Sequence, residues 1–293
     1  MFTGSLVALV TPMTDTGELD LSALGALLDW HLEAGTDGIV LLGTTGESPT
    51  INASERKLLI ESCAAHLQGR IPLIVGSGTN DTAHSIELTR QAMELGADAS
   101  LLVTPYYNKP TDTGLLAHYQ AIAEAVPIPQ ILYNVPGRTG CDLSLEVVRQ
   151  LAQCPNIVAV KDASADLTRV PDLVAVANAF DVLSGDDATA LQLIAAGGRG
   201  VISVTANVAP LAVKQMMDFA LAGNIDSANS LQSKLEALND VLFVQSNPIP
   251  VKWLLQRMGK IKGALRLPLT TLEHGLQGRV EQAAQQAGIA LPA

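Results

Sequence analysis

Short apolar runs alternate along most of the chain with longer stretches of helical spacing, and this alternation constrains the fold more than any other feature. Eight such runs, rich in Val, Ile and Leu, are each followed by a polar or glycine-rich turn. Strands that are apolar almost throughout are typical of a parallel sheet buried on both faces, with helices as right-handed crossovers. Eight strand and helix units predict an α/β fold, the closed (β/α)8 TIM barrel. The expected strands are 5–10, 38–42, 72–75, 100–103, 130–133, 157–161, 181–183 and 200–203.

Helix start and stop signals fall between the expected strands. Asn52 and Ser54 can cap the second helix, with Glu55 in its first turn. Glycines stand where helix ends need a left-handed residue, at Gly35, Gly96 and Gly197. The expected helices include 21–34, 53–67, 81–95 and 187–196.

The strand pattern stops near Gly223 and only helical spacing continues. Helices are expected at 227–238, 248–258 and 272–287. The sequence therefore predicts a barrel over residues 1–223 and a small C-terminal helical extension, packed on the barrel, over residues 224–293.

Composition narrows the classes of partner. The net charge of −11 and the pI near 4.8 argue against binding to nucleic acid or to an anionic membrane, because a basic surface is what such binding needs. No apolar stretch approaches the roughly 18 residues that cross a bilayer, and the N-terminus lacks a signal-peptide pattern. We therefore expect a cytoplasmic protein with a small-molecule substrate. Cys63, Cys141 and Cys154 have no disulfide or zinc spacing and are expected to be reduced thiols.

Lys161 ends the apolar run 157–161, and it is the only lysine in the chain that ends a segment predicted to be a buried strand. In a TIM barrel, the carboxyl ends of the strands carry the active site. Burial disfavours the ammonium form, so such an amine is easier to deprotonate and can attack a carbonyl group. The alternative is a lysine whose charged head reaches water at the strand end.

The turn Gly43-Thr44-Thr45-Gly46 follows the second strand. Its two hydroxyls and closely spaced N–H groups suit a small carboxylate or a phosphate. Phosphate is less favoured, because the usual phosphate loops of this barrel follow strands seven and eight, and one of these carries Asp186 and Asp187. The alternative is an ordinary connecting turn.

Tyr107, Tyr133 and Arg138 follow or end strands four and five. Each tyrosine can relay a proton near the amine, although a strand-end tyrosine can also simply pack its ring. Arg138 lies in a Pro-Gly turn, where its guanidinium could bind a substrate carboxylate through two hydrogen bonds. The alternative is a solvated loop arginine.

No His, Asp or Glu cluster has the spacing of a metal site, and His31, His66 and His118 lie in expected helices as structural or surface residues. No Gly-rich nucleotide motif and no Gly-x-Ser-x-Gly motif follows a strand. A lysine mechanism without a metal or cofactor remains.

Four motifs in order carry a resemblance to a known family: Gly-Thr-Thr-Gly-Glu-Ser at 43–48, Tyr-Tyr-Asn-Lys-Pro at 106–110, Tyr-Asn-Val-Pro-Gly-Arg-Thr at 133–139 and Val-Lys-Asp-Ala at 160–163. With these, the whole chain, including residues 184–187, 202–207 and 247–252, closely resembles the bacterial 4-hydroxy-tetrahydrodipicolinate (dihydrodipicolinate) synthases. The resemblance implies a lyase of lysine and diaminopimelate biosynthesis that condenses pyruvate with L-aspartate 4-semialdehyde through a Schiff base on Lys161.

The resemblance also implies residue roles. Tyr133 would shuttle protons to and from the bound pyruvate, and Thr44 would link it to Tyr107 of a neighbouring subunit. Thr45 would hold the pyruvate carboxylate, beside Gly185 and Ile202, and Arg138 would bind the semialdehyde carboxylate. The implied assembly is a homotetramer made of two tight dimers.

Two other functions remain open from the sequence. Other pyruvate-dependent aldolases, such as the N-acetylneuraminate lyases, share the lysine, the tyrosine and the threonine turn but generally lack an arginine like Arg138, whose presence favours the synthase. A third possibility is a catalytically silent barrel that senses a small keto acid.

Feedback inhibition by lysine is expected to be weak or absent. In inhibited relatives the resemblance places lysine at the dimer interface, here Pro49, Ala53, Arg56, Asn80, His84 and Tyr106. Asn80 and Tyr106 fit that pattern, but Ala53 and His84 stand where histidine and glutamate are common, so a carboxylate partner for the lysine ammonium is missing. Asp162 replaces a common glutamate, with no clear consequence from the sequence.

Overall fold

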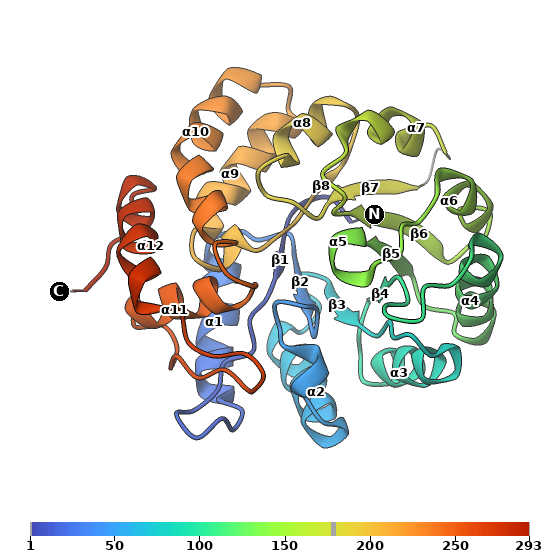
Figure 1. The fold of residues 1–293 in the computed structure, drawn as a ribbon, viewed down its shortest axis with the longest axis horizontal. Helices are drawn as coiled ribbons and strands as arrows, with labels where there is room; N and C mark the ends of the chain where they lie inside the picture. The colour runs from blue at the N-terminus through green and yellow to red at the C-terminus, as the bar shows by residue number, and fades with distance from the viewer. Residues whose placement is uncertain (1, 177–179, 293) are drawn as a thin grey trace.

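Eight parallel strands close into a barrel in which each strand pairs with its neighbours in chain order, and β1 pairs with β8 (Figure 1). The computed structural model describes residues 2–176 and 180–292. The predicted (β/α)8 barrel is therefore confirmed. The strands are β1 Gly4–Ala8, β2 Gly38–Leu41, β3 Leu73–Gly76, β4 Ala99–Val103, β5 Gln130–Asn134, β6 Ile157–Asp162, β7 Asp181–Ser184 and β8 Gly200–Ser203.

Helices surround the strands on the outside of the barrel (Figure 1). They are α1 Leu21–Glu33, α2 Ala53–Leu67, α3 Thr82–Glu94, α4 Asp112–Ala125, α6 Leu145–Leu151, α7 Val170–Val174, α8 Ala190–Ala195 and α9 Pro210–Leu221. Shorter turns of helix lie in the loops, as η1 Ser48–Thr50, α5 Pro136–Thr139, η2 Leu167–Arg169 and η3 Thr205–Asn207.

The helix expected at 187–196 begins only at Ala190, so its predicted start was wrong. The side chain of Asp187 does not cap a helix. It is buried and accepts hydrogen bonds from the Ser203 hydroxyl and from the backbone N–H groups of Val204 and Thr205. This contact joins the ends of β7 and β8 at the mouth of the barrel.

Helix α2 begins where the sequence predicts. The Asn52 side chain accepts from the Glu55 N–H, and the Glu55 carboxylate accepts from the Asn52 N–H, which is a complete capping box. Ser54 does not cap the helix, because its hydroxyl donates to the Asn52 side chain instead. The three glycines expected in the left-handed region have φ angles of 75° at Gly35, 95° at Gly96 and 101° at Gly197.

The C-terminal extension consists of α10 Ile225–Val241, α11 Ile249–Arg257 and α12 His274–Gln286, beside α9 and α1 (Figure 1). Its apolar side chains, among them Leu235, Trp253 and Val280, belong to one continuous hydrophobic cluster with Leu28 of α1 and Val213 of α9. The extension is therefore packed on the barrel helices through a shared core. The boundary between residues 223 and 224 stays a prediction.

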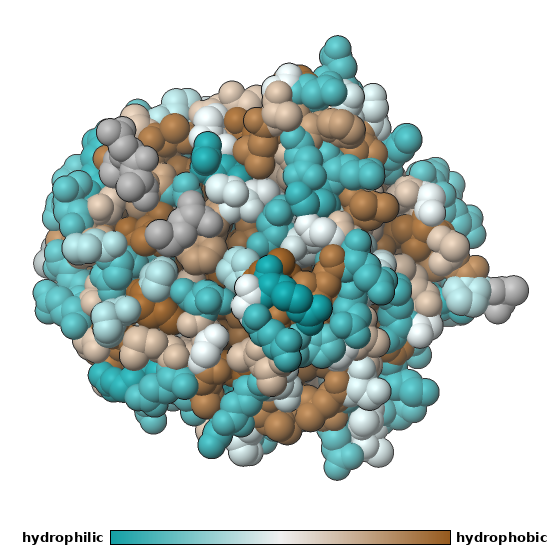
Figure 2. Space-filling view, turned by 180° about the vertical axis from the view of Figure 1, so that it is seen from behind, coloured by the Kyte–Doolittle hydropathy of each residue, from teal (hydrophilic) through white to brown (hydrophobic). Residues whose placement is uncertain are grey.

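On the face shown in Figure 2, hydrophobic side chains lie in small groups among hydrophilic ones. In the part of the chain that the structure describes, no helix has both the length and the apolar character needed to span a membrane. Cys63, Cys141 and Cys154 are free thiols, as expected.

A buried ion pair joins the extension to the turn after β2. The Lys252 ammonium of α11 lies 2.5 Å from the Glu47 carboxylate, and the two side chains are 0% and 1% exposed. Burial lowers the pKa of Lys252, while the charge of Glu47 acts in the opposite direction. The second oxygen of Glu47 accepts from the Arg266 N–H, and the Arg266 guanidinium binds both oxygens of Glu55. These contacts hold the turn against the extension.

Replacing Lys252 by methionine should lower the free energy of unfolding by about 3 to 5 kcal/mol, because the Glu47 charge would stay buried without a partner. Urea denaturation measures this change. Lys57→Met is the matched control, since Lys57 pairs with Glu61 at 3.8 Å on the exposed face of α2, and its expected loss is about 1 kcal/mol or less. The double variant Glu47→Gln with Lys252→Met should recover part of the loss. Equal effects of Lys252→Met and Lys57→Met would contradict the prediction.

Candidate active site

A cavity of about 130 Å³ opens at the carboxyl ends of the strands. Six residues singled out from the sequence line it: Thr44, Thr45, Tyr133, Arg138, Lys161 and Gly185. The remaining lining residues are Ala8, Val40, Gly43, Leu101, Val135, Ala163, Asp186, Val204, Phe243 and Asn247. The structure thus brings together residues from β1, β2, β4, β5, β6, the loops after β7 and β8, and the extension.

Lys161 is held in β6 by pairing on both sides, opposite Tyr133 of β5 and Leu183 of β7. The residue is 6% exposed, so its side chain does not extend into bulk water. Its Nζ lies 4.2 Å from the centroid of the Tyr133 ring. No carboxylate lies within ion-pair distance of this amine among residues 2–176 and 180–292. A buried amine beside a phenol is a suitable nucleophile for a carbonyl carbon.

Gly185 makes room for the Lys161 side chain. A Cβ atom at this position would lie 2.9 Å from Lys161 Cε and 2.7 Å from Ala163 Cβ, closer than such atoms pack. The Gly185 N–H donates to the Asp162 carbonyl at 2.7 Å, which holds the backbone after β7 close to the end of β6. Any larger residue would therefore push the lysine stem out of its place.

The Thr44-Thr45 turn is tightly folded. Gly46 N–H donates to the Gly43 carbonyl and Glu47 N–H to the Thr44 carbonyl, and Glu47 has a left-handed φ of 55°. The Thr11 hydroxyl donates to the Gly46 carbonyl at 2.7 Å from beneath. The turn therefore presents both threonines at the cavity from a rigid backbone.

Asn247 connects the two candidate carboxylate-binding residues. Its side-chain amide nitrogen donates to the Thr45 hydroxyl at 2.9 Å, and its backbone carbonyl accepts from the Arg138 guanidinium at 3.4 Å. Since the Thr45 oxygen already accepts this bond, its own proton is free to be donated to a ligand. In the sequence, Asn247 stands out only as part of the segment 247–252, and no pattern points to Phe243. Both come from the extension, far from the barrel strands in sequence.

Two predicted site residues do not line the cavity. Ile202 is 1% exposed and packs with Tyr133 and Leu183 in the barrel interior, whereas Val204 lines the cavity after β8. Tyr107 is 89% exposed and has a left-handed φ of 73°. Its side chain is therefore directed outward in this single chain.

The residues proposed for lysine binding come from the loops after β2, β3 and β4 and from α2 and α3, and they have different environments. Arg56 is buried, donates to the Gly76 carbonyl at 2.7 Å, and burial lowers its pKa to about 10. The Asn80 carbonyl accepts from Asn108, and exposed His84 lies 3.4 Å from the Glu87 carboxylate. Tyr106 is 42% exposed, and Pro49 lies in η1.

Histidines have structural contacts rather than a shared site. His31 bonds the Thr36 hydroxyl, His118 bonds the Thr82 hydroxyl, and burial lowers the pKa of each to about 4. His66 lies 2.7 Å from the Asp29 carboxylate at the surface. Within the described residues, no group of three His, Cys, Asp or Glu side chains is arranged to hold a metal ion.

This chain is similar to known proteins over almost its whole length. A chain from Coxiella burnetii named 4-hydroxy-tetrahydrodipicolinate synthase is 55% identical over 289 residues, which is 99% of each protein. The solved chloride-inhibited dihydrodipicolinate synthase from Acinetobacter baumannii, complexed with pyruvate, is 49% identical with a TM-score of 0.97, over 99% of this chain and 100% of that one. A DHDPS from Cyanidioschyzon merolae with lysine bound is 39% identical with a TM-score of 0.96, over 99% of both chains.

The family match has the same extent. The sequence profile described as the dihydrodipicolinate synthetase family covers residues 1–287. That span includes every strand of the barrel, every residue of the cavity and the three helices of the extension. The chain therefore belongs to the dihydrodipicolinate synthetase family.

Proposed function

We propose that this chain condenses pyruvate with L-aspartate 4-semialdehyde to 4-hydroxy-tetrahydrodipicolinate, through a Schiff base on Lys161. The observation that carries this proposal is the buried Lys161 amine in a cavity that also contains Tyr133, Thr45 and Arg138. The family match over residues 1–287 and the names of the full-length relatives support the same reaction. The relative from A. baumannii is a complex with pyruvate.

The chemistry follows from one nitrogen. Lys161 Nζ attacks the carbonyl carbon of pyruvate, water leaves, and an imine forms that withdraws electrons from the neighbouring methyl group. Loss of a methyl proton gives an enamine, whose carbon attacks the aldehyde carbon of the semialdehyde. The amine of the second substrate then replaces Nζ at the former carbonyl carbon. This last exchange closes the ring and releases Lys161 for another turnover.

Other residues have positions suited to the charges of these steps. The free proton of the Thr45 hydroxyl can bind the pyruvate carboxylate, and Gly185 leaves the space beside Lys161 Cε. The Tyr133 ring lies next to Nζ, where its hydroxyl can carry protons. Thr44 on the cavity wall would link it to the Tyr107 of a neighbouring subunit. Arg138 can bind the carboxylate of the semialdehyde at the rim of the cavity. Ile202 packs beneath Tyr133 and supports this floor.

The alternative functions have less support. A pyruvate lyase acting on a neutral sugar chain has no need of a guanidinium at this rim, where Arg138 lies. A silent keto-acid sensor has no need of a buried amine. Since the carbon–nitrogen bond to Lys161 activates the substrate, we propose that no metal or organic cofactor takes part. The cytoplasmic location stays a prediction.

Treatment with pyruvate and borohydride should reduce the imine and attach the three-carbon unit irreversibly to Lys161. Mass spectrometry of peptides maps the adduct. Lys161→Arg should give no adduct and no turnover, whereas Arg138→Ala should still give the adduct but lose most activity with the semialdehyde. An adduct on another lysine, or full turnover by Lys161→Arg, would refute the proposal.

We further propose a homotetramer of two tight dimers, in which Tyr107 completes the site of the partner. Tyr107 is 89% exposed and directed away from the cavity of its own chain, so it supports this proposal. A tyrosine in this position can relay protons only in the cavity of another subunit. Refolding a mixture of two inactive variants, Lys161→Arg and Tyr107→Phe, should restore activity, since one site of each mixed pair then has both native residues. No recovery, in mixtures that sedimentation velocity shows to be tetramers, would rule out a shared site.

Lysine should inhibit the enzyme weakly or not at all. His84 and Ala53 supply no carboxylate for the lysine ammonium, and the Arg56 guanidinium adds a positive charge nearby. Steady-state assays over rising lysine measure this, and His84→Glu, which adds a carboxylate, should increase the inhibition. Half-inhibition of the unmodified enzyme at low lysine concentration would overturn the prediction.

A further inference from the structure

The loop that carries Arg138 begins after Asn134, and the Asn134 side chain binds the other end of the same loop. Asn134 is the last residue of β5 and is fully buried. Its carbonyl oxygen Oδ1 accepts from the Leu143 N–H at 3.0 Å, and its amide Nδ2 donates to the Asp142 carboxylate at 2.7 Å. The loop 135–143 is therefore closed on itself, with α5 and Arg138 at its centre.

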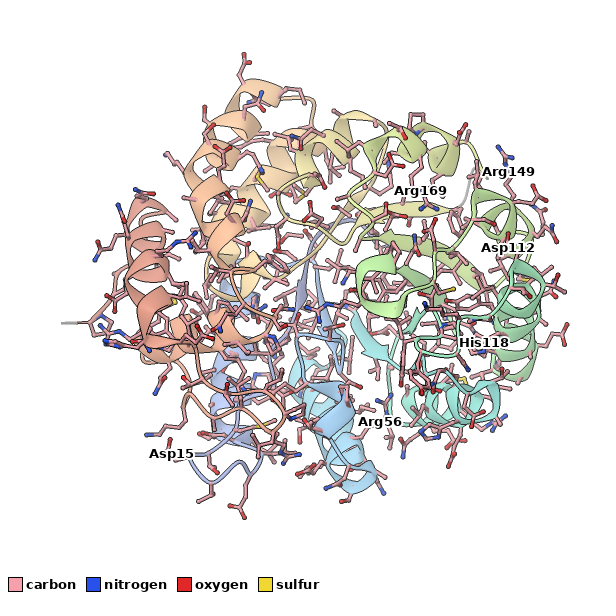
Figure 3. The ribbon with its side chains drawn as sticks, in the orientation of Figure 1. Asp15, Arg56, Asp112, His118, Arg149 and Arg169 are labelled. Atoms are coloured by element: carbon pink, nitrogen blue, oxygen red, sulfur yellow. The ribbon has the colours of Figure 1, made fainter. Side chains whose placement is uncertain are left out.

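Arg169 binds the same end of this loop from η2. Its Nη1 donates to the Asp142 carboxylate at 2.9 Å, and its Nη2 donates to the Leu143 carbonyl at 2.5 Å. The Arg169 side chain is 15% exposed and its bond to the Leu143 carbonyl is partly buried, whereas the Asp142 side chain is 54% exposed. The contacts are charge-assisted, and the pair with Asp142 lies at the edge of the protein. In Figure 3 Arg169 lies above α5 and toward the barrel, whereas Arg149 lies at the outer edge.

Asp162 provides the second carboxylate of this group. It lies 3.6 Å from Arg169 Nε and accepts from Asn134 Nδ2 at 3.2 Å, and it is 6% exposed. Because neighbouring residues of a strand point to opposite sides, this carboxylate lies on the other side of β6 from the Lys161 side chain. We call Asn134, Asp142, Asp162 and Arg169 the Arg169 cluster. In it, one guanidinium separates two carboxylates that would otherwise repel each other.

The hydrogen bonds of the cluster are shorter than those that α5 makes with segments outside loop 135–143. The Thr104 and Thr139 hydroxyls are 3.3 Å apart, the Tyr107 N–H lies 3.4 Å from the Thr139 carbonyl, and Arg138 itself lies 3.4 Å from the Asn247 carbonyl. These are long hydrogen bonds, whereas the bonds of Arg169 are short and involve charge. Lys161, in contrast, is held by strands on both sides.

We propose that Arg169 is a positioning residue for the second substrate: by binding the end of loop 135–143, it sets the place of the Arg138 guanidinium. This proposal rests on the proposed function, in which Arg138 binds the carboxylate of the aldehyde. Loss of Arg169 would then weaken the binding of this carboxylate and leave the imine chemistry of Lys161 intact. In this proposal Asp162, next to Lys161 in the chain, acts outside the cavity by holding the Arg169 guanidinium.

The test compares Arg169→Met with Arg149→Met, a control on α6. Arg149 is exposed, and its guanidinium lies as far as 4.0 Å from the Glu146 carboxylate, so this ion pair is weak. In Arg169→Met, the KM for the semialdehyde should rise about tenfold or more, since small misplacements of a binding group have effects of this size. The KM for pyruvate and the rate of borohydride adduct formation should stay within about twofold of the parent, as should all values of Arg149→Met. Arg169→Lys keeps the positive charge but loses the paired donors of the guanidinium, so its KM for the semialdehyde should lie between those of the parent and Arg169→Met.

A double-mutant cycle separates positioning from general damage. If Arg169 acts through Arg138, adding Arg169→Met to Arg138→Ala should cause little further loss of kcat/KM for the semialdehyde. Independent, multiplying losses would overturn the proposal, as would an unchanged semialdehyde KM in Arg169→Met. If Arg169→Met were too unstable to assay, as judged by its Tm, Arg169→Lys would give the same two outcomes. An absent pyruvate adduct in the unmodified enzyme would instead refute the proposed function itself.

Discussion

Backbone pairing of β6 with both of its neighbours is the constraint on which the site depends. A lysine at the end of an exposed edge strand would be solvated, but barrel closure leaves no edge, so Lys161 lies between Tyr133 and Leu183 at the mouth. The same closure brings the turn after β2 and the loop after β5 to one cavity. Gly185 then provides the space that the lysine stem needs. The reactive amine is thus positioned by backbone geometry before any side chain contributes.

The extension completes what the barrel begins. Asn247 bonds Thr45, Lys252 neutralises Glu47, and Arg266 binds both Glu47 and Glu55. All of these contacts end on the turn after β2 or on the start of α2. The extension is therefore part of the substrate site as well as a covering for apolar helices, and a change in its core would be felt at Thr45.

The strands, most helix ends and six lining residues could be predicted, because apolar runs, caps and strand-end positions depend on nearby sequence. Phe243, Asn247 and the Arg169 cluster could not, since their contacts join segments far apart in the chain. The predicted start of α8 was wrong, because the Asp187 side chain binds the loop after β8 and the helix begins only at Ala190. The resemblance named Ile202 of β8, while the cavity is lined by Val204, which follows the last strand residue Ser203.

The bond from the Asn247 amide to Thr45 has a consequence for what the cavity accepts. An amide nitrogen can only donate, so the Thr45 oxygen uses one of its two lone pairs for this bond, and its hydrogen stays available for a ligand. A ligand with an oxygen lone pair at this point can accept that hydrogen. One hydrogen-bond direction, set by a residue about 200 positions away in the chain, therefore leaves a hydrogen-bond donor at the cavity wall.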